Sequence, residues 1–140
     1  MAPTAYDDTP IRQRIGPWSP DGAPDLSAFA PATNYFVRAA AGSGKTTSLV
    51  ARMVALVRQG AAPDHLAAIT FTRKAAGEMT TRFFAELERT RDALDREAAP
   101  AEWAAVDAGL RQAQRAFIGT IHAFCGRILR ERPLAVGLPP

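Results

Sequence analysis

The chain has little cysteine and no strong excess of charge. Its 140 residues include one cysteine, and 17 Lys and Arg stand against 14 Asp and Glu, which gives a formal net charge of +3. A single Cys125 cannot form an internal disulfide, which is typical of a reducing compartment. Because the net charge is small, the grouping of charges is more informative about partners than their total.

Long hydrophobic runs are also missing. No apolar stretch approaches the roughly 18 residues that span a bilayer, and Asp7 and Asp8 lie where a secretory signal would carry its apolar segment. We therefore expect a soluble, cytoplasmic protein with no membrane partner. A chain of this length buries roughly two-thirds of its unfolded surface, so we expect one domain or part of one.

Proline is unevenly distributed. Residues 1–31 hold six of the eleven prolines, so continuous helix or strand is not expected there and the segment is interpreted as an extended lead-in. Regular patterns occupy residues 32–133. The last residues, 134–140, are predicted to be a short loose tail.

The stretch from 35 to 50 reads YFVRAAAGSGKTTSLV, an apolar run followed by a glycine-containing turn and an amphipathic segment. This is the strand, turn and helix of a phosphate-binding P-loop, in which Gly42 and Gly44 permit a tight turn with inward-facing N–H groups. Lys45 would meet the β and γ phosphates, and Thr46 would bind Mg²⁺. The predicted nucleotide-binding residues are Ala39, Ala40, Ala41, Gly42, Ser43, Gly44, Lys45 and Thr46.

Two further apolar segments lead into a threonine that can cap a helix. Residues 66–71 (LAAITF) predict a strand buried on both faces, followed by a helix after Thr72, and residues 116–120 (AFIGT) predict a strand before a helix capped by Thr120. A helix starting at Pro100 is expected between them. Gly77, inside the helix after Thr72, predicts a close approach to the backbone.

Strand followed by helix thus occurs three times, which predicts an α/β fold with a parallel sheet and flanking helices. Right-handed crossovers place all three turns at the carboxyl edge of the sheet, where ligands of open α/β folds bind. Cationic and hydroxyl groups there could hold a second string of phosphates, and Phe71 and Phe124 could stack on bases. A core position is the alternative for both aromatic residues.

Three motifs resemble those of UvrD-like superfamily 1 DNA helicases. AAAGSGKT (39–46), AITFTRKAAGEM (68–79) and GTIHAFCGRILR (119–130) are similar to motifs I, Ia and Ib, and the helical insertion before the last one resembles the RecB/AddA branch. Arg73 stands where many members have Asn. The resemblance covers about residues 34–131 and implies that 32–133 is part of a RecA-like P-loop ATP-binding domain, with ATP and Mg²⁺ as cofactors.

The same resemblance implies a single-stranded DNA site and a role in DNA repair or recombination, and its further partner would be a nuclease or helicase subunit. The DNA-binding residues would be Thr70, Phe71, Thr72, Lys74, Thr120, His122 and Phe124. Gln13 is upstream of the loop, where helicases of this kind often recognise adenine, although an ordinary exposed glutamine is the alternative. His122 and Cys125 are not expected to bind zinc, which needs four ligands.

The acidic residues of a hydrolytic P-loop site are missing. Hydrolysis needs an acid at the end of another strand for Mg²⁺ and a glutamate that activates water. The nearest match, WAAVD at 103–107, follows a helical period and has no Glu after Asp107. We expect the ATP-binding portion of a helicase or translocase, truncated and inactive alone. A non-catalytic DNA- or partner-binding module and a small P-loop kinase or NTPase remain alternatives.

Overall fold

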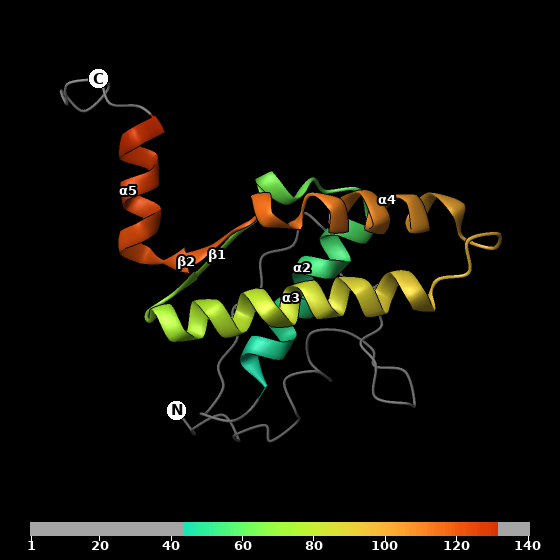
Figure 1. Cartoon of the computed structure of the whole chain (residues 1–140), viewed down its shortest axis with the longest axis horizontal. Helices are drawn as coiled ribbons and strands as arrows, with labels where there is room; N and C mark the ends of the chain where they lie inside the picture. The colour runs from blue at the N-terminus through green and yellow to red at the C-terminus, as the bar shows by residue number, and fades with distance from the viewer. Residues whose placement is uncertain (1–43, 132–140) are drawn as a thin grey trace, which may run out of the picture.

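The computed structural model describes residues 44–131, which form four helices, two strands and two short 3₁₀ turns (Figure 1). The chain order is α2 (Lys45–Arg58), η2 (Pro63–His65), β1 (Ala67–Thr70), α3 (Arg73–Ala93), α4 (Pro100–Arg111), η3 (Ala113–Arg115), β2 (Phe117–Thr120) and α5 (Ile121–Glu131). The predicted lead-in, Gln13, the apolar run at 35–37, residues 39–43 and the tail lie outside the described residues.

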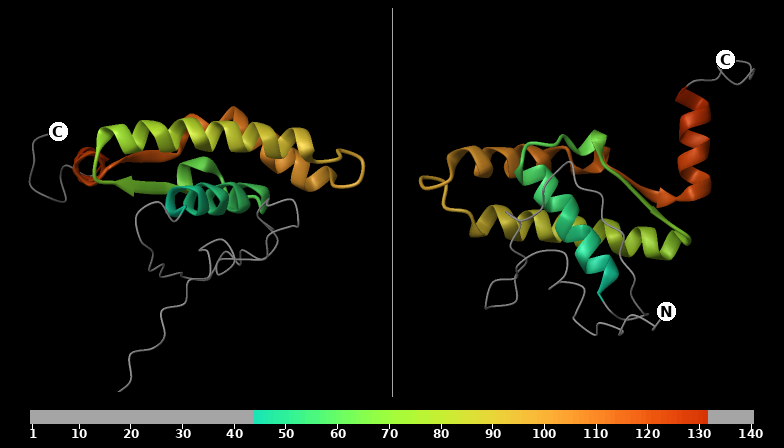
Figure 2. Two further views of the ribbon diagram at one scale, coloured as in Figure 1. Left: turned by 90° about the horizontal axis from the view of Figure 1, so that it is seen from below. Right: turned by 180° about the vertical axis from the view of Figure 1, so that it is seen from behind.

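The two strands are parallel, as the alternation of strands and helices predicts. Ala67 pairs with Phe117, and the register continues to Thr70 opposite Thr120. The connection between them runs through α3 and α4, which lie side by side in opposite directions (Figures 1 and 2). Parallel strands require such a long crossover because both must be entered from the same end.

The prediction that β1 is buried on both faces is wrong. Ala68 is 3% exposed and belongs to the hydrophobic core, whereas Ala67 is exposed and Ile69 is 42% exposed. Helix α3 packs on the sheet, and among residues 44–131 no element covers the face that carries Ile69. The apolar run therefore indicates a strand correctly, but it does not show how much of its surface this part of the chain buries.

The core lies where α2 crosses α3 and α4 (Figure 2). Its largest fully buried side chains are Phe83, Leu87, Val54, Val57 and Val106. The rear of α2 and the inner face of α3 supply most of it, which is the helical periodicity expected from the sequence. Helix α5 projects away from these three helices and has no buried residue (Figure 1).

Helix ends follow their sequence signals. Gly60 has a φ of 95°, and the N–H groups of Gly60 and Ala61 donate to the carbonyls of Val57 and Leu56, which is a Schellman motif. Thr72 and Thr120 act as predicted, because their hydroxyls accept from the N–H groups three residues further on. No helix within residues 44–131 has both the length and the apolar character needed to cross a membrane.

The close approach of backbone expected at Gly77 occurs instead at Gly109. A Cβ added at Gly77 would meet no atom within 4 Å, because this residue lies on the exposed face of α3. A Cβ at Gly109 would overlap Cγ1 of Val57, where α4 packs on α2. Gly109 therefore lets the two helices approach at the centre of the core.

Replacing Gly109 by alanine is expected to lower the free energy of unfolding by about 1–3 kcal/mol, because the added methyl group overpacks the contact with Val57. Urea denaturation followed by circular dichroism measures the change. Gly77→Ala is the matched control and is expected to raise stability by up to about 1 kcal/mol, since alanine is the better helix former. Equal stability of Gly109→Ala and the wild type would contradict the packing described.

Candidate functional site

The predicted phosphate site begins at the N-terminus of α2. Gly44 precedes the helix with φ 82° and ψ 15°, a left-handed conformation that glycine adopts without steric cost, and its carbonyl accepts the N–H of Ser48 at 2.9 Å. Lys45, the first residue of the helix, is exposed, and Thr46 is half-buried. Backbone N–H groups, an ammonium and a hydroxyl at a helix N-terminus suit a polyphosphate with a divalent cation. Residues 39–43, which would complete the loop, lie outside the described part.

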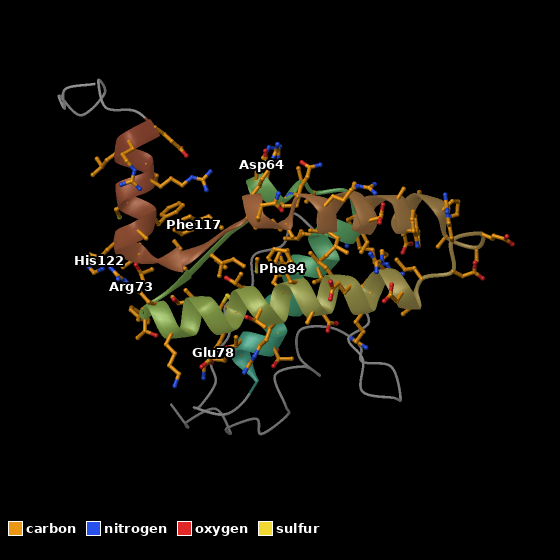
Figure 3. All side chains as sticks on the ribbon, viewed as in Figure 1. Asp64, Arg73, Glu78, Phe84, Phe117 and His122 are labelled. Atoms are coloured by element: carbon orange, nitrogen blue, oxygen red, sulfur yellow. The ribbon has the colours of Figure 1, made fainter. Side chains whose placement is uncertain are left out.

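A second group of predicted residues lies at the carboxyl ends of β1 and β2. The parallel register places Thr70 beside Thr120, and α3 and α5 begin directly after these positions. Arg73 and His122 lie at this same end of the sheet (Figure 3), and both are exposed, as is Lys74. The sheet therefore brings together the second and third predicted motifs.

The two candidate stacking residues differ in their surroundings. Phe71 is 96% exposed, so the alternative of a core position does not hold for it. Phe124 is half-buried, with its ring centroid 5.1 Å from that of Phe117, and the guanidinium of Arg127 lies 5.8 Å from the centroid of Phe117. Of the two aromatic residues, Phe71 therefore offers the larger free surface to a ligand.

The threonine hydroxyls at this edge are engaged within the protein. The hydroxyl of Thr70 donates to the carbonyl of Thr72 at 2.9 Å. The hydroxyl of Thr72 accepts from the N–H of Ala75 at 3.1 Å, and that of Thr120 accepts from the N–H of Ala123 at 3.2 Å. The capping bonds follow from the sequence pattern. The bond from Thr70 was not predicted, although a threonine two residues before a helix cap is a known signal for a local turn.

The model of the UvrD/REP helicase N-terminal domain family matches residues 25–139 of the chain. The chain belongs to this family. Its membership confirms the expected relation to UvrD-like helicases of the RecB/AddA type.

Curated relatives of this UvrD/REP helicase N-terminal chain are named as a subunit of an ATP-dependent helicase/nuclease. The protein of Syntrophomonas wolfei is 41% identical over 117 residues, which cover 77% of this chain and 8% of the relative. That of Latilactobacillus sakei is 40% identical over 98 residues, 70% of this chain and 11% of the relative. That of Desulforudis audaxviator is 39% identical over 110 residues, 76% and 8%. The chain thus spans about a tenth of these relatives or less, and no solved structure matches it.

The acidic residue nearest to a Walker B pattern does not lie at the end of a strand in this UvrD/REP family chain. Asp107 is in the middle of α4, and its carboxylate pairs with Arg111 one turn later at 2.6 Å. Its side chain is only 14% exposed. The helical period that the sequence predicts for WAAVD is confirmed, and Asp107 is occupied by a structural ion pair.

Replacing Thr72 by alanine is expected to lower the free energy of unfolding by about 1 kcal/mol, because α3 loses the side-chain acceptor of its first turn. Thr72→Ser keeps that acceptor and is expected to stay within about 0.5 kcal/mol of the wild type. Chemical denaturation measures both variants. Thr81→Ala, on an exposed position of the same helix, serves as the control, and an equal loss there would show that the cap is not the cause.

Proposed function

We propose that the chain is the ATP-binding part of an ATP-dependent DNA helicase or translocase that acts in DNA repair or recombination. The observation that carries the proposal is the sequence Gly44-Lys45-Thr46 at the start of α2, with Gly44 left-handed and Lys45 exposed, in a member of the UvrD/REP helicase family. A P-loop of the RecA-like type provides this arrangement for a nucleotide.

In this proposal ATP and Mg²⁺ occupy the N-terminus of α2. The backbone N–H groups and the helix dipole hold the phosphates, Lys45 neutralises the β and γ phosphates, and the hydroxyl of Thr46 binds Mg²⁺. Residues 39–43 supply the remaining amides of the loop, and Gln13 contacts the adenine. Exposed positions suit Lys45 and the first turn of α2 for this role, since a ligand must reach them from solvent.

Single-stranded DNA lies along the carboxyl edge of β1 and β2 in the same proposal. Phe71 stacks on a base, and Lys74, with His122 on the neighbouring element, faces the phosphate chain. Thr70, Thr72, Thr120 and Phe124 complete the edge. The support is the exposure of Phe71, Lys74 and His122 at one end of the sheet. Because the relatives are named as subunits of a helicase/nuclease, a nuclease or helicase subunit is the proposed protein partner, in the cytoplasm.

ATP turnover is not expected from the 140-residue chain alone. Hydrolysis needs an acid that positions Mg²⁺ and a group that activates water, and the nearest acidic match, Asp107, is held in α4 by Arg111. This pairing favours a second candidate function, a binding module that holds DNA or a partner without turnover. A small P-loop kinase or NTPase is the remaining alternative, which phosphate transfer to a small acceptor would support.

Substituting Lys45 by alanine is expected to weaken the binding of Mg²⁺-ATP at least tenfold, because the phosphates lose their fixed positive charge. Isothermal titration measures this affinity, and Lys74→Ala is the control that should leave it unchanged. ATP hydrolysis in the presence of single-stranded DNA is expected to stay at background for both the wild type and Lys45→Ala. Hydrolysis that depends on Lys45 would refute the absence of turnover.

Lys74→Ala is expected to reduce the salt dependence of DNA binding. Each phosphate contact to a single strand contributes about −0.7 to the slope of log affinity against log salt concentration. Loss of one contact should therefore flatten the slope by about 0.7, as measured by fluorescence anisotropy with a labelled oligothymidine. Lys45→Ala should keep the wild-type slope if the nucleotide and DNA sites are separate. An unchanged slope for Lys74→Ala would remove this residue from the DNA site.

A further inference from the structure

Phe71 is flanked by two threonines that bond to each other across it. The hydroxyl of Thr70 donates to the carbonyl of Thr72 at 2.9 Å, and the phenylalanine between them is 96% exposed. An aromatic side chain gains about 1.5–3 kcal/mol when it is buried, so an almost fully exposed position needs a structural cause. The hydrogen bond from Thr70 to Thr72 closes a local turn with Phe71 at its tip.

Both ends of this turn are fixed by the rest of the fold. Thr70 is the last residue of β1, where it pairs with Thr120 of β2. Thr72 is the N-cap of α3, and its carbonyl also accepts the N–H of Ala76 at 3.1 Å while its hydroxyl accepts the N–H of Ala75 at 3.1 Å. Because a sheet holds one side of the turn and a helix holds the other, the Phe71 side chain is directed to solvent.

The direction of the Thr70 hydrogen bond matters for its role. A threonine hydroxyl carries a single proton, and here that proton goes to the carbonyl of Thr72. Thr70 therefore cannot donate to a DNA phosphate while the turn is closed. Its predicted place in the DNA site is better explained by the residue that it orients than by a contact of its own.

We propose that Thr70 is a positioning residue that holds Phe71 ready to stack on an unpaired base. The inference rests on the proposed function, because it concerns the single-stranded DNA edge of the same site. Holding the ring in place before DNA arrives lowers the entropy lost on binding, since the turn is already ordered. Removing the hydroxyl of Thr70 leaves the ring present but frees it, so binding weakens through Phe71.

A double-mutant cycle on the full 140-residue chain tests this coupling, with a labelled oligothymidine as the probe and fluorescence anisotropy as the readout. Phe71→Ala is expected to weaken binding about tenfold, the usual scale for one stacked base. Thr70→Val, which suits a strand position, is expected to weaken it severalfold. In the Phe71→Ala background, Thr70→Val should cause no further loss. Additive losses would show a direct DNA contact by Thr70, and wild-type affinity for Thr70→Val would also overturn the proposal.

Two control variants separate positioning from general damage. Thr70→Ser keeps the hydroxyl and is expected to bind as the wild type does. Thr81→Val removes a hydroxyl that also donates to a backbone carbonyl, that of Gly77 at 3.2 Å, but far from Phe71 along α3, and should not change DNA affinity. The salt slope should be the same for Thr70→Val and the wild type, because no phosphate contact is lost. A flatter slope would contradict positioning.

Folding of each variant is checked by thermal melting. If Thr70→Val does not fold, Thr70→Ala replaces it in the same cycle, and additivity with Phe71→Ala remains the refuting result. Failure of the proposed function looks different: the wild type would then not bind oligothymidine, or its binding would not depend on Lys74, and both proposals would fall. Binding that depends on Lys74 without coupling between Thr70 and Phe71 would overturn this inference alone.

Discussion

The parallel pairing of β1 with β2 is the constraint on which the rest of the described structure depends. Two parallel strands must both end at the same edge, so the chain has to return through a long crossover, here α3 and α4. The register then fixes Thr70 beside Thr120 and makes α3 and α5 begin together. Polar, cationic and aromatic residues that are about fifty positions apart in sequence therefore gather at one end of the sheet.

Packing of the helices keeps that edge rigid. The contact of α2 with α3 and α4 fills the core around Phe83 and Val54, and Gly109 allows α4 to approach α2 closely. The N-terminus of α2 remains exposed at its own end, since the buried residues of the helix begin at Ser48. A buried rear half with an open first turn suits a helix that holds an anion, because the helix is fixed while its amides stay accessible.

The features that the sequence predicts correctly are those set by neighbouring residues. The caps at Thr72 and Thr120, the stop at Gly60 and the two short strands each depend on a few consecutive positions. The incorrect predictions concern contacts between distant segments. Burial of β1 on both faces depends on which elements cover the sheet, and the packing role that Gly77 suggested belongs to Gly109, because only the crossing of α2 and α4 decides where a Cβ does not fit.

The same distinction applies to the candidate site. Phosphate binding requires consecutive residues at one helix N-terminus, so a motif such as GSGKT can be recognised from sequence alone. The exposure of Phe71 depends on both the strand before it and the cap after it, and the structure was needed to reveal it.

Hydrolysis depends on still more distant residues, because its acidic groups must reach the phosphate from another strand. Asp107 shows why an acid in an apolar run is not enough. Helix α4 directs its carboxylate along the helix to Arg111, where it stabilises the helix and has no part in holding a metal for the loop. Binding and turnover are therefore separable properties in this part of the chain, since binding depends on residues close together in sequence and turnover on residues from other strands.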